Sequence, residues 1–176
     1  MNKTGKTAFG GVITSISVAA MFLTTIFPFF SYVLPICAGI LMIVANEELG
    51  MSWSFGIYSA VSVISLLILA DKEAAIMYIV IFGYYPIIKG KIEHLGKVFA
   101  LILKLIICNT AFVISYYIII KIFGFSGEEF DEFGKYTIPM LIILSNILFL
   151  LTDFILSVLS ELYKKRIKKH IGRIFK

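Results

Sequence analysis

The sequence predicts an all-α integral membrane protein, a six-helix transmembrane bundle formed by a single domain over residues 1–176, with both termini cytoplasmic. Three observations support this prediction. The 176 residues are 60% hydrophobic and 15% charged, whereas soluble domains are about 45–50% apolar and about 25% charged. The hydrophobic residues form long blocks, as membrane-spanning helices require. The cationic residues gather in three places that border these blocks.

The distribution of Lys and Arg predicts the topology. Twelve of the sixteen cations lie at the N-terminus (Lys3, Lys6), in residues 89–97 and in the tail, residues 164–176. The connectors that alternate with these segments hold three cations and six acidic residues. Cytoplasmic segments of membrane proteins carry an excess of Lys and Arg, so the three basic segments are expected on the cytoplasmic side. The net charge of +5 then reflects anchoring beside the lipid bilayer, and nucleic acid is not expected as a partner.

Six blocks are expected to cross the membrane, followed by a basic amphipathic tail at 163–176. Their approximate bounds are residues 7–30, 32–45, 52–70, 74–88, 98–123 and 136–162. The first block is longer than the 7–15-residue apolar region of a signal peptide, so we expect it to be retained as a span. Trp53, at the start of the third block, is a typical interfacial anchor. A tight polar turn joins the third block to the fourth, and a Gly- and acid-rich connector at 124–135 joins the fifth to the sixth.

The second block is the shortest. Its roughly 14 residues rise about 21 Å as a helix, less than the ~30 Å hydrocarbon core, so a re-entrant segment and five crossings are the alternative. The charge pattern favours six, because removing one crossing would place Lys3 and Lys6 on the side opposite the other two basic segments. Glu47 and Glu48 are then expected at the cytoplasmic interface, where acidic residues contribute little to orientation.

Two ionisable residues lie inside the predicted spans. Lys104 is seven positions after Lys97, about 10 Å along the helix, and Asp153 precedes the basic tail by eleven positions, about 16 Å. A charge at such depth costs several kcal/mol and usually finds a partner inside the bundle. We therefore expect Lys104 and Asp153 to pair, with Asn109 or Asn146 nearby. A coupling or gating site fits this pattern, as do a structural lock and a Lys104 side chain that extends to the interface.

Small residues recur at four-residue spacing in two spans. The first span carries the stripe Gly11, Ser15 and Ala19, and the third carries Ser52, Gly56 and Ala60. Small side chains let helix backbones approach closely within a membrane. Packing inside the bundle and packing against another subunit are both consistent with these stripes.

A candidate solute-binding region lies at the outer face. It consists of aromatic and charged residues in or near the connectors: Tyr32, Asp71, Lys72, Glu73, Tyr78, Tyr116 and Tyr117. Short loops with aromatic walls and a few polar groups are typical of small-molecule sites. Interfacial anchoring by the aromatic residues is the alternative interpretation.

Motifs of catalysis and metal binding are absent from the sequence. There is no HExxH, GxSxG or cluster of His, Cys and Asp ligands, and Gly5-Lys6-Thr7 matches only the last three positions of a phosphate-binding loop. Cys37 and Cys108 lie within apolar blocks, without the spacing of a metal site. We expect no enzyme activity, no metal and no cofactor.

Taken together, the six spans, the chain length, the cytoplasmic termini and the stripe in the first span resemble the S components of energy-coupling factor transporters. These are substrate-binding membrane subunits. The resemblance implies a multi-pass protein of the bacterial cell membrane that binds a solute, a vitamin or metal ion in that family, near the outer loops. It also implies dependence on a transmembrane coupling subunit and separate ATPases. In that family an alanine stripe on the first span contacts the coupling subunit, and the matching positions here are Gly11, Ser15 and Ala19.

Two other functions fit the sequence. A non-transport membrane scaffold, or an assembly or regulatory protein, would use the same stripes to bind other membrane proteins. A standalone proton-coupled carrier would use Asp153, but the inverted repeats that are common in such carriers are not visible in the sequence.

Overall fold

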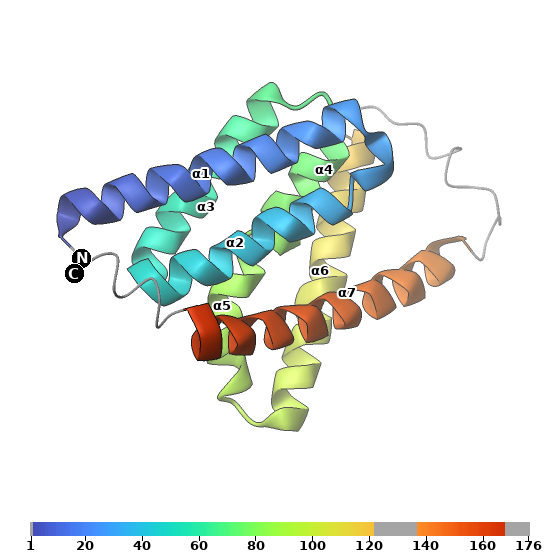
Figure 1. The fold of residues 1–176 in the computed structure, drawn as a ribbon. Coiled ribbons are helices and arrows are strands. Elements are labelled where there is room, and N and C mark those ends of the chain that lie inside the picture. The colour runs from blue at the N-terminus through green and yellow to red at the C-terminus, as the bar shows by residue number, and fades with distance from the viewer. Residues whose placement is uncertain (1, 122–136, 168–176) are drawn as a thin grey trace. The chain divides into compact units, whose positions relative to one another are not determined.

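The computed structural model describes residues 2–121 and 137–167, and within these ranges the chain forms helices and turns without any β-strand (Figure 1). The predicted all-helical fold class is confirmed. The elements are α1 (Lys3–Ile26), the 3-10 turn η1 (Pro28–Phe30), α2 (Val33–Leu49), α3 (Met51–Ile68), α4 (Lys72–Met77), the π-helix η2 (Tyr78–Phe82), α5 (Tyr85–Glu93), α6 (Lys97–Lys121), α7 (Thr137–Leu162) and the π-helical turn η5 (Tyr163–Ile167). The predicted connector at 124–135 and the tail beyond 167 lie outside the described residues.

Within the described residues, five helical stretches are long and apolar enough to cross a membrane. They are Lys3–Ile26, Met51–Ile68, Lys72–Glu93, Lys97–Ile119 and Pro139–Lys165. Large apolar side chains such as Leu67, Val98 and Phe154 are exposed on them, as expected for helices that face lipid rather than water. The chain is therefore a multi-pass membrane protein. Helix α2, with 17 residues and a length of about 25 Å, is shorter than these five.

The chain forms two compact units. The first comprises residues 1–89 and 154–176, and the second comprises residues 90–153. In the first unit, α1, α2, α3 and the segment α4–η2 pack around a core of fully buried side chains that includes Met21, Met42, Val61 and Tyr78. The second unit contains α6 and most of α7.

Contacts at their ends fix the relative directions of the helices in the first unit. At one end, the backbone N–H of Ala70 donates to Thr25 Oγ1 at 3.4 Å. At the other end, a Cβ added to Gly10 would lie 3.4 Å from the Ile57 side chain and 3.8 Å from Leu49. Helices α1 and α3 therefore run parallel to each other, and α2 runs antiparallel to both.

Helix α2 also packs closely against the π-helix η2. Gly39 faces the backbone carbonyl oxygen of Phe82 so closely that a Cβ on Gly39 would overlap this oxygen. The backbone of η2 thus occupies the space that a side chain on Gly39 would need, which fixes glycine at this position.

Replacing Gly39 with Ala is expected to lower the stability of the folded protein by about 1–3 kcal/mol, the usual cost of overpacking. The backbone carbonyl cannot move aside as the end of a flexible side chain can. Thermal unfolding in detergent measures the effect. Gly90→Ala is the matched control, because no described atom lies within 4 Å of its added Cβ; equal losses of stability in the two variants would contradict the prediction.

Candidate functional site

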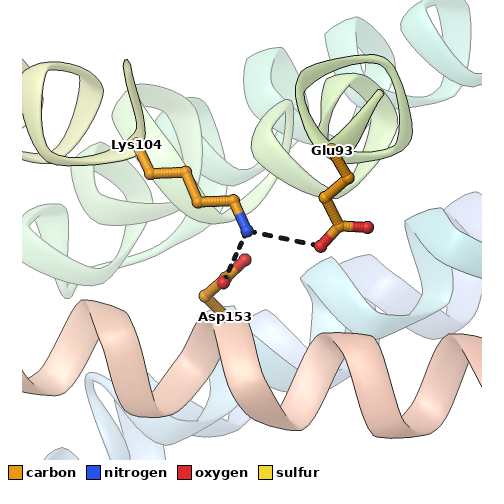
Figure 2. A network of polar contacts seen from close by, with 3 residues as sticks. All are labelled: Glu93, Lys104 and Asp153. Carbon is orange, nitrogen blue, oxygen red and sulfur yellow. Dashed lines mark hydrogen bonds and ion pairs between the residues drawn. The ribbon is translucent and has the colours of Figure 1, made fainter. Parts of the chain in front are cut away.

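A cluster of three ionised side chains lies in the second unit (Figure 2). Lys104 Nζ on α6 is 2.8 Å from Asp153 Oδ2 on α7 and 3.3 Å from Glu93 Oε1 at the end of α5. The side chains of Lys104 and Asp153 are only 10% and 14% exposed, whereas that of Glu93 is 44% exposed. The structure thus brings together the two residues that the sequence suggests as a pair and adds Glu93 as a third member.

The asparagines form a separate contact deeper along the same two helices. Asn109 and Asn146 exchange two hydrogen bonds, of 3.2 Å and 3.0 Å, and each also donates to a backbone carbonyl of its own helix. They lie near Lys104 and Asp153 in the sequence, but their side-chain amides bond to each other and not to the ion cluster. One charged pair and one pair of amides therefore join α6 to α7, along with a longer contact of 3.8 Å from the Cys108 thiol to the Ser145 carbonyl.

The ion cluster holds two carboxylates and one ammonium group, so its formal charge is −1. Because Lys104 and Asp153 are mostly buried, removal of either partner would leave a charge in an apolar environment, which is far more costly than the net value of the pair. Within the second unit, the geometry is suited to holding Glu93, at the end of α5, beside Lys104 of α6 and Asp153 of α7. Sequence reasoning missed Glu93 because it lies in the basic segment 89–97, which is predicted to be a cytoplasmic connector.

The outer-face candidates in the first unit form a smaller polar cluster. The hydroxyl of Tyr32, just before α2, donates to the Glu73 carboxylate. Asp71 Oδ1 accepts from the Ala74 N–H at 3.0 Å and caps α4, while Lys72 Nζ donates to the Leu66 carbonyl at 2.8 Å. Burial and the Glu73 carboxylate raise the pKa of Tyr32, so its hydroxyl stays protonated and remains a donor.

The remaining three tyrosines of the predicted ligand region have different surroundings. Tyr78 is fully buried in the core of the first unit, and its hydroxyl has no hydrogen-bond partner among the described residues. Tyr116 and Tyr117 belong to the second unit, where Tyr116 stacks on Phe112 with ring centroids 6.4 Å apart and Tyr117 is exposed. In the first unit, the cluster at the N-terminal ends of α2 and α4 therefore comprises Tyr32, Asp71, Lys72 and Glu73.

The small-residue stripe of α3 lines a groove together with Gly11, the first residue of the α1 stripe. The groove lies between α1 and α3 and is lined by Thr7, Gly10, Gly11, Thr14, Ser52, Trp53, Gly56, Ile57 and Ala60. A Cβ added to Gly11 or to Gly56 would meet no described atom within 4 Å, and the other two residues of the α1 stripe, Ser15 and Ala19, are also exposed. The stripe on α1 thus faces outward.

A second set of polar contacts joins the C-terminal ends of α2 and α7. The Tyr163 hydroxyl donates to Glu48 at 2.8 Å, and Lys164 Nζ is 3.0 Å from Glu47 Oε1. Lys89, placed by the sequence among the basic anchors, is only 5% exposed, and its ammonium lies 5.9 Å from the centre of the Tyr85 ring. A buried lysine in an otherwise basic connector gives no signal in the sequence.

Comparison with known proteins gives no match: no family model, no curated protein and no solved structure shows significant similarity to this chain. Inferences about its function therefore rest on the contacts described above.

Replacing Lys104 or Asp153 singly with Ala is expected to destabilise the protein by about 3–5 kcal/mol, because each change removes one side of a mostly buried ion pair, and Asp153→Ala leaves Lys104 beside only the more exposed Glu93. The double variant should lose much less than the sum of the two single losses, and thermal unfolding in detergent measures this coupling. Glu93→Gln, at the more exposed member, should cost less than either. Strictly additive losses would show that Lys104 and Asp153 do not interact.

Proposed function

We propose that this chain is a solute-binding membrane subunit of the S-component type, which binds a separate transmembrane coupling subunit and depends on separate ATPases. The observation that supports this proposal is the groove between α1 and α3, lined by small residues of both helices. The proposed location is the bacterial plasma membrane.

The groove fits a helix of another membrane protein better than it fits lipid alone. Lipid provides no hydrophobic force that brings helices together, so helix association relies on close backbone packing at small residues. Gly11 and Gly56 have open space in front of them and are not required by packing within the described part of the chain. A partner helix that lies in the groove would approach both backbones.

Six crossings, with both termini cytoplasmic, are part of this proposal. Helix α2 begins beside α4, through the contact of Tyr32 with Glu73, and ends beside the C-terminal end of α7, through Tyr163 and Glu48. Its two ends thus lie level with the ends of helices that are long enough to span. The pairing of Glu47 with Lys164 also neutralises an acid at the end of α2, which lowers the cost of placing a 17-residue helix across the bilayer.

Six crossings predict opposite sides for the two ends of α2. In a variant without Cys37 and Cys108, a membrane-impermeant maleimide added to intact cells should label Ser31→Cys. It should label Ser52→Cys only after permeabilisation, because the reagent cannot cross the bilayer. Labelling of both positions from outside would support the re-entrant alternative.

The proposed solute site is the cluster of Tyr32, Asp71, Lys72 and Glu73. It offers two carboxylates, a cation and a tyrosine hydroxyl within the first unit, next to exposed aromatic residues of η1 such as Phe29. Polar groups in small number beside aromatic side chains are typical of sites that fix the orientation of a small molecule.

Filling the groove should prevent assembly. Gly11→Leu and Gly56→Leu are expected to reduce co-purification with a coupling subunit and an ATPase pair by roughly tenfold, the effect of losing about 1.4 kcal/mol of binding free energy. Neither substitution meets a described atom at its Cβ, so thermal stability should stay close to that of the unmodified protein. Val12→Leu, at a neighbouring exposed position of α1, is the control and should co-purify normally.

The composition of the complex separates the transporter subunit from the membrane scaffold. Recovery of ATPases and a coupling subunit, together with a small molecule detected by mass spectrometry in the purified protein, supports the transporter subunit. A stable complex with an unrelated membrane protein, without ATPases and without a retained solute, would contradict it and support the membrane scaffold.

A further inference from the structure

The groove between α1 and α3 lies near the ends where both helices begin. Gly10, seven residues after the start of α1, lies against Ile57, which is six residues after the start of α3. Because the helices run parallel, their first turns lie side by side and differ in level by only about 1.5 Å. The groove has a volume of about 470 Å³, and most of its lining residues are small or apolar. An alkyl chain suits such a surface better than a polar molecule does.

The end of this groove carries cations and hydrogen-bond donors. Lys3 is exposed and lies one turn before Thr7, on the face of α1 that lines the groove, and Lys6 adds a second cation nearby. Ser52 and Trp53, whose hydroxyl and indole N–H are donors, are exposed residues of the lining. Neither the two lysine side chains nor these two donors have an ion pair or hydrogen bond with a described residue. Their charge and donors are therefore available to an anionic group.

The two helix N-termini add to this positive charge. No side chain caps α1 or α3, and neither first turn contains an acidic residue, so the unpaired N–H groups and the helix dipoles favour an anion here. The C-terminal end of α2 lies beside them and offsets only one of the two positive helix ends. The acids at that end of α2 bind other groups: Glu47 is 3.0 Å from Lys164, and Glu48 accepts from Tyr163 at 2.8 Å.

We propose that this groove binds an anionic phospholipid. An acyl chain lies between α1 and α3, and the phosphate lies at Lys3, where Ser52, Trp53 and the N-terminal N–H groups donate to its oxygens. Helix N-termini are common phosphate sites, and basic pockets between membrane helices bind the headgroups of anionic lipids. Such binding requires neither the proposed transport function nor a particular orientation of α1 in the membrane.

An anionic headgroup suits this end of the groove better than a zwitterionic one. The choline of phosphatidylcholine would bring another cation next to Lys3, whereas phosphatidylglycerol carries only the negative charge of its phosphate. The expected preference for phosphatidylglycerol is about fivefold in affinity, which corresponds to about 1 kcal/mol for one lysine near the membrane surface. The partner helix that we propose for the same groove would displace this lipid on assembly, so the groove holds one or the other.

The fluorescence of Trp53 reports on this site directly, because Trp53 lines the groove and is the single tryptophan of the chain. Brominated acyl chains quench tryptophan fluorescence on contact. With the full chain in phosphatidylcholine bilayers, brominated phosphatidylglycerol should bind at Trp53 about fivefold more tightly than brominated phosphatidylcholine with the same chains. Lys3→Gln should bring the two affinities close to equal. Lys97→Gln removes the same charge from an exposed position outside the groove and should keep the preference.

A second pair of variants tests the acyl chain. Gly56→Leu fills the groove without meeting a described atom at its Cβ, so it should abolish the preference, while Val63→Leu, at an exposed position of α3 outside the groove, should keep it.

Four outcomes would overturn the lipid site. They are equal affinities of the two lipids in the unmodified protein, an equal loss of preference in Lys97→Gln and Lys3→Gln, and a preference that persists in Gly56→Leu. The fourth is the absence of quenching by either lipid, which would show that protein, such as a second copy of this chain, closes the groove.

Discussion

The structure depends on one constraint: the hydrocarbon interior of a membrane has no water to satisfy backbone polar groups. Regular helices meet this constraint by themselves, and the interrupted span Lys72–Glu93 does not. At the break between η2 and α5, the Tyr58 hydroxyl donates to the Ile79 carbonyl, because the Gly83 N–H donates to the Tyr78 carbonyl instead. A side chain of α3 thus replaces the donor that the π-helix leaves out. Asn46 Nδ2, on α2, adds a bond of 3.3 Å to the Ile87 carbonyl within α5, and among the described residues this span is the most buried of the five.

The same constraint acts on side chains in the second unit. Lys104 with Asp153, and Asn109 with Asn146, pair across α6 and α7 in an antiparallel order. Hydrophobic burial does not favour one rotation of two apolar helices about their axes, because apolar side chains contact lipid as favourably as they contact the other helix. Polar pairs do favour one rotation, since only one rotation lets both the ion pair and the amide pair form. The ion pair and the amide pair together therefore define how these two helices face each other.

The sequence was sufficient to predict those features that follow from one large free-energy cost. Hydrophobic blocks predicted the helices, and the cost of an isolated charge in lipid is the reason to expect Lys104 and Asp153 side by side. The break in the fourth span was not predictable in this way. Gly83 and Pro86 are visible in the sequence, but both residue types are tolerated in membrane helices, and the partner that fixes the π-helix, Tyr58, comes from another helix. Lys89 was missed because nothing in a basic connector indicates that one of its lysines is buried, and Glu93 was missed because a position in that connector gives no sign of a contact with a charge inside the bundle.

The glycines in these helices are of two kinds: some are required by packing within this chain, and others lie on a surface that is open to other molecules. Glycine in a helix interior costs about 1 kcal/mol relative to alanine, so each helical glycine requires a reason. At Gly39 and Gly83 the reason is steric, because a backbone carbonyl and two tyrosine rings occupy the space of a Cβ. At Gly11 and Gly56 the described chain offers no such reason, and both line the same groove. The reason that we infer for them lies outside this chain, in the backbone of a partner helix that requires the space they leave.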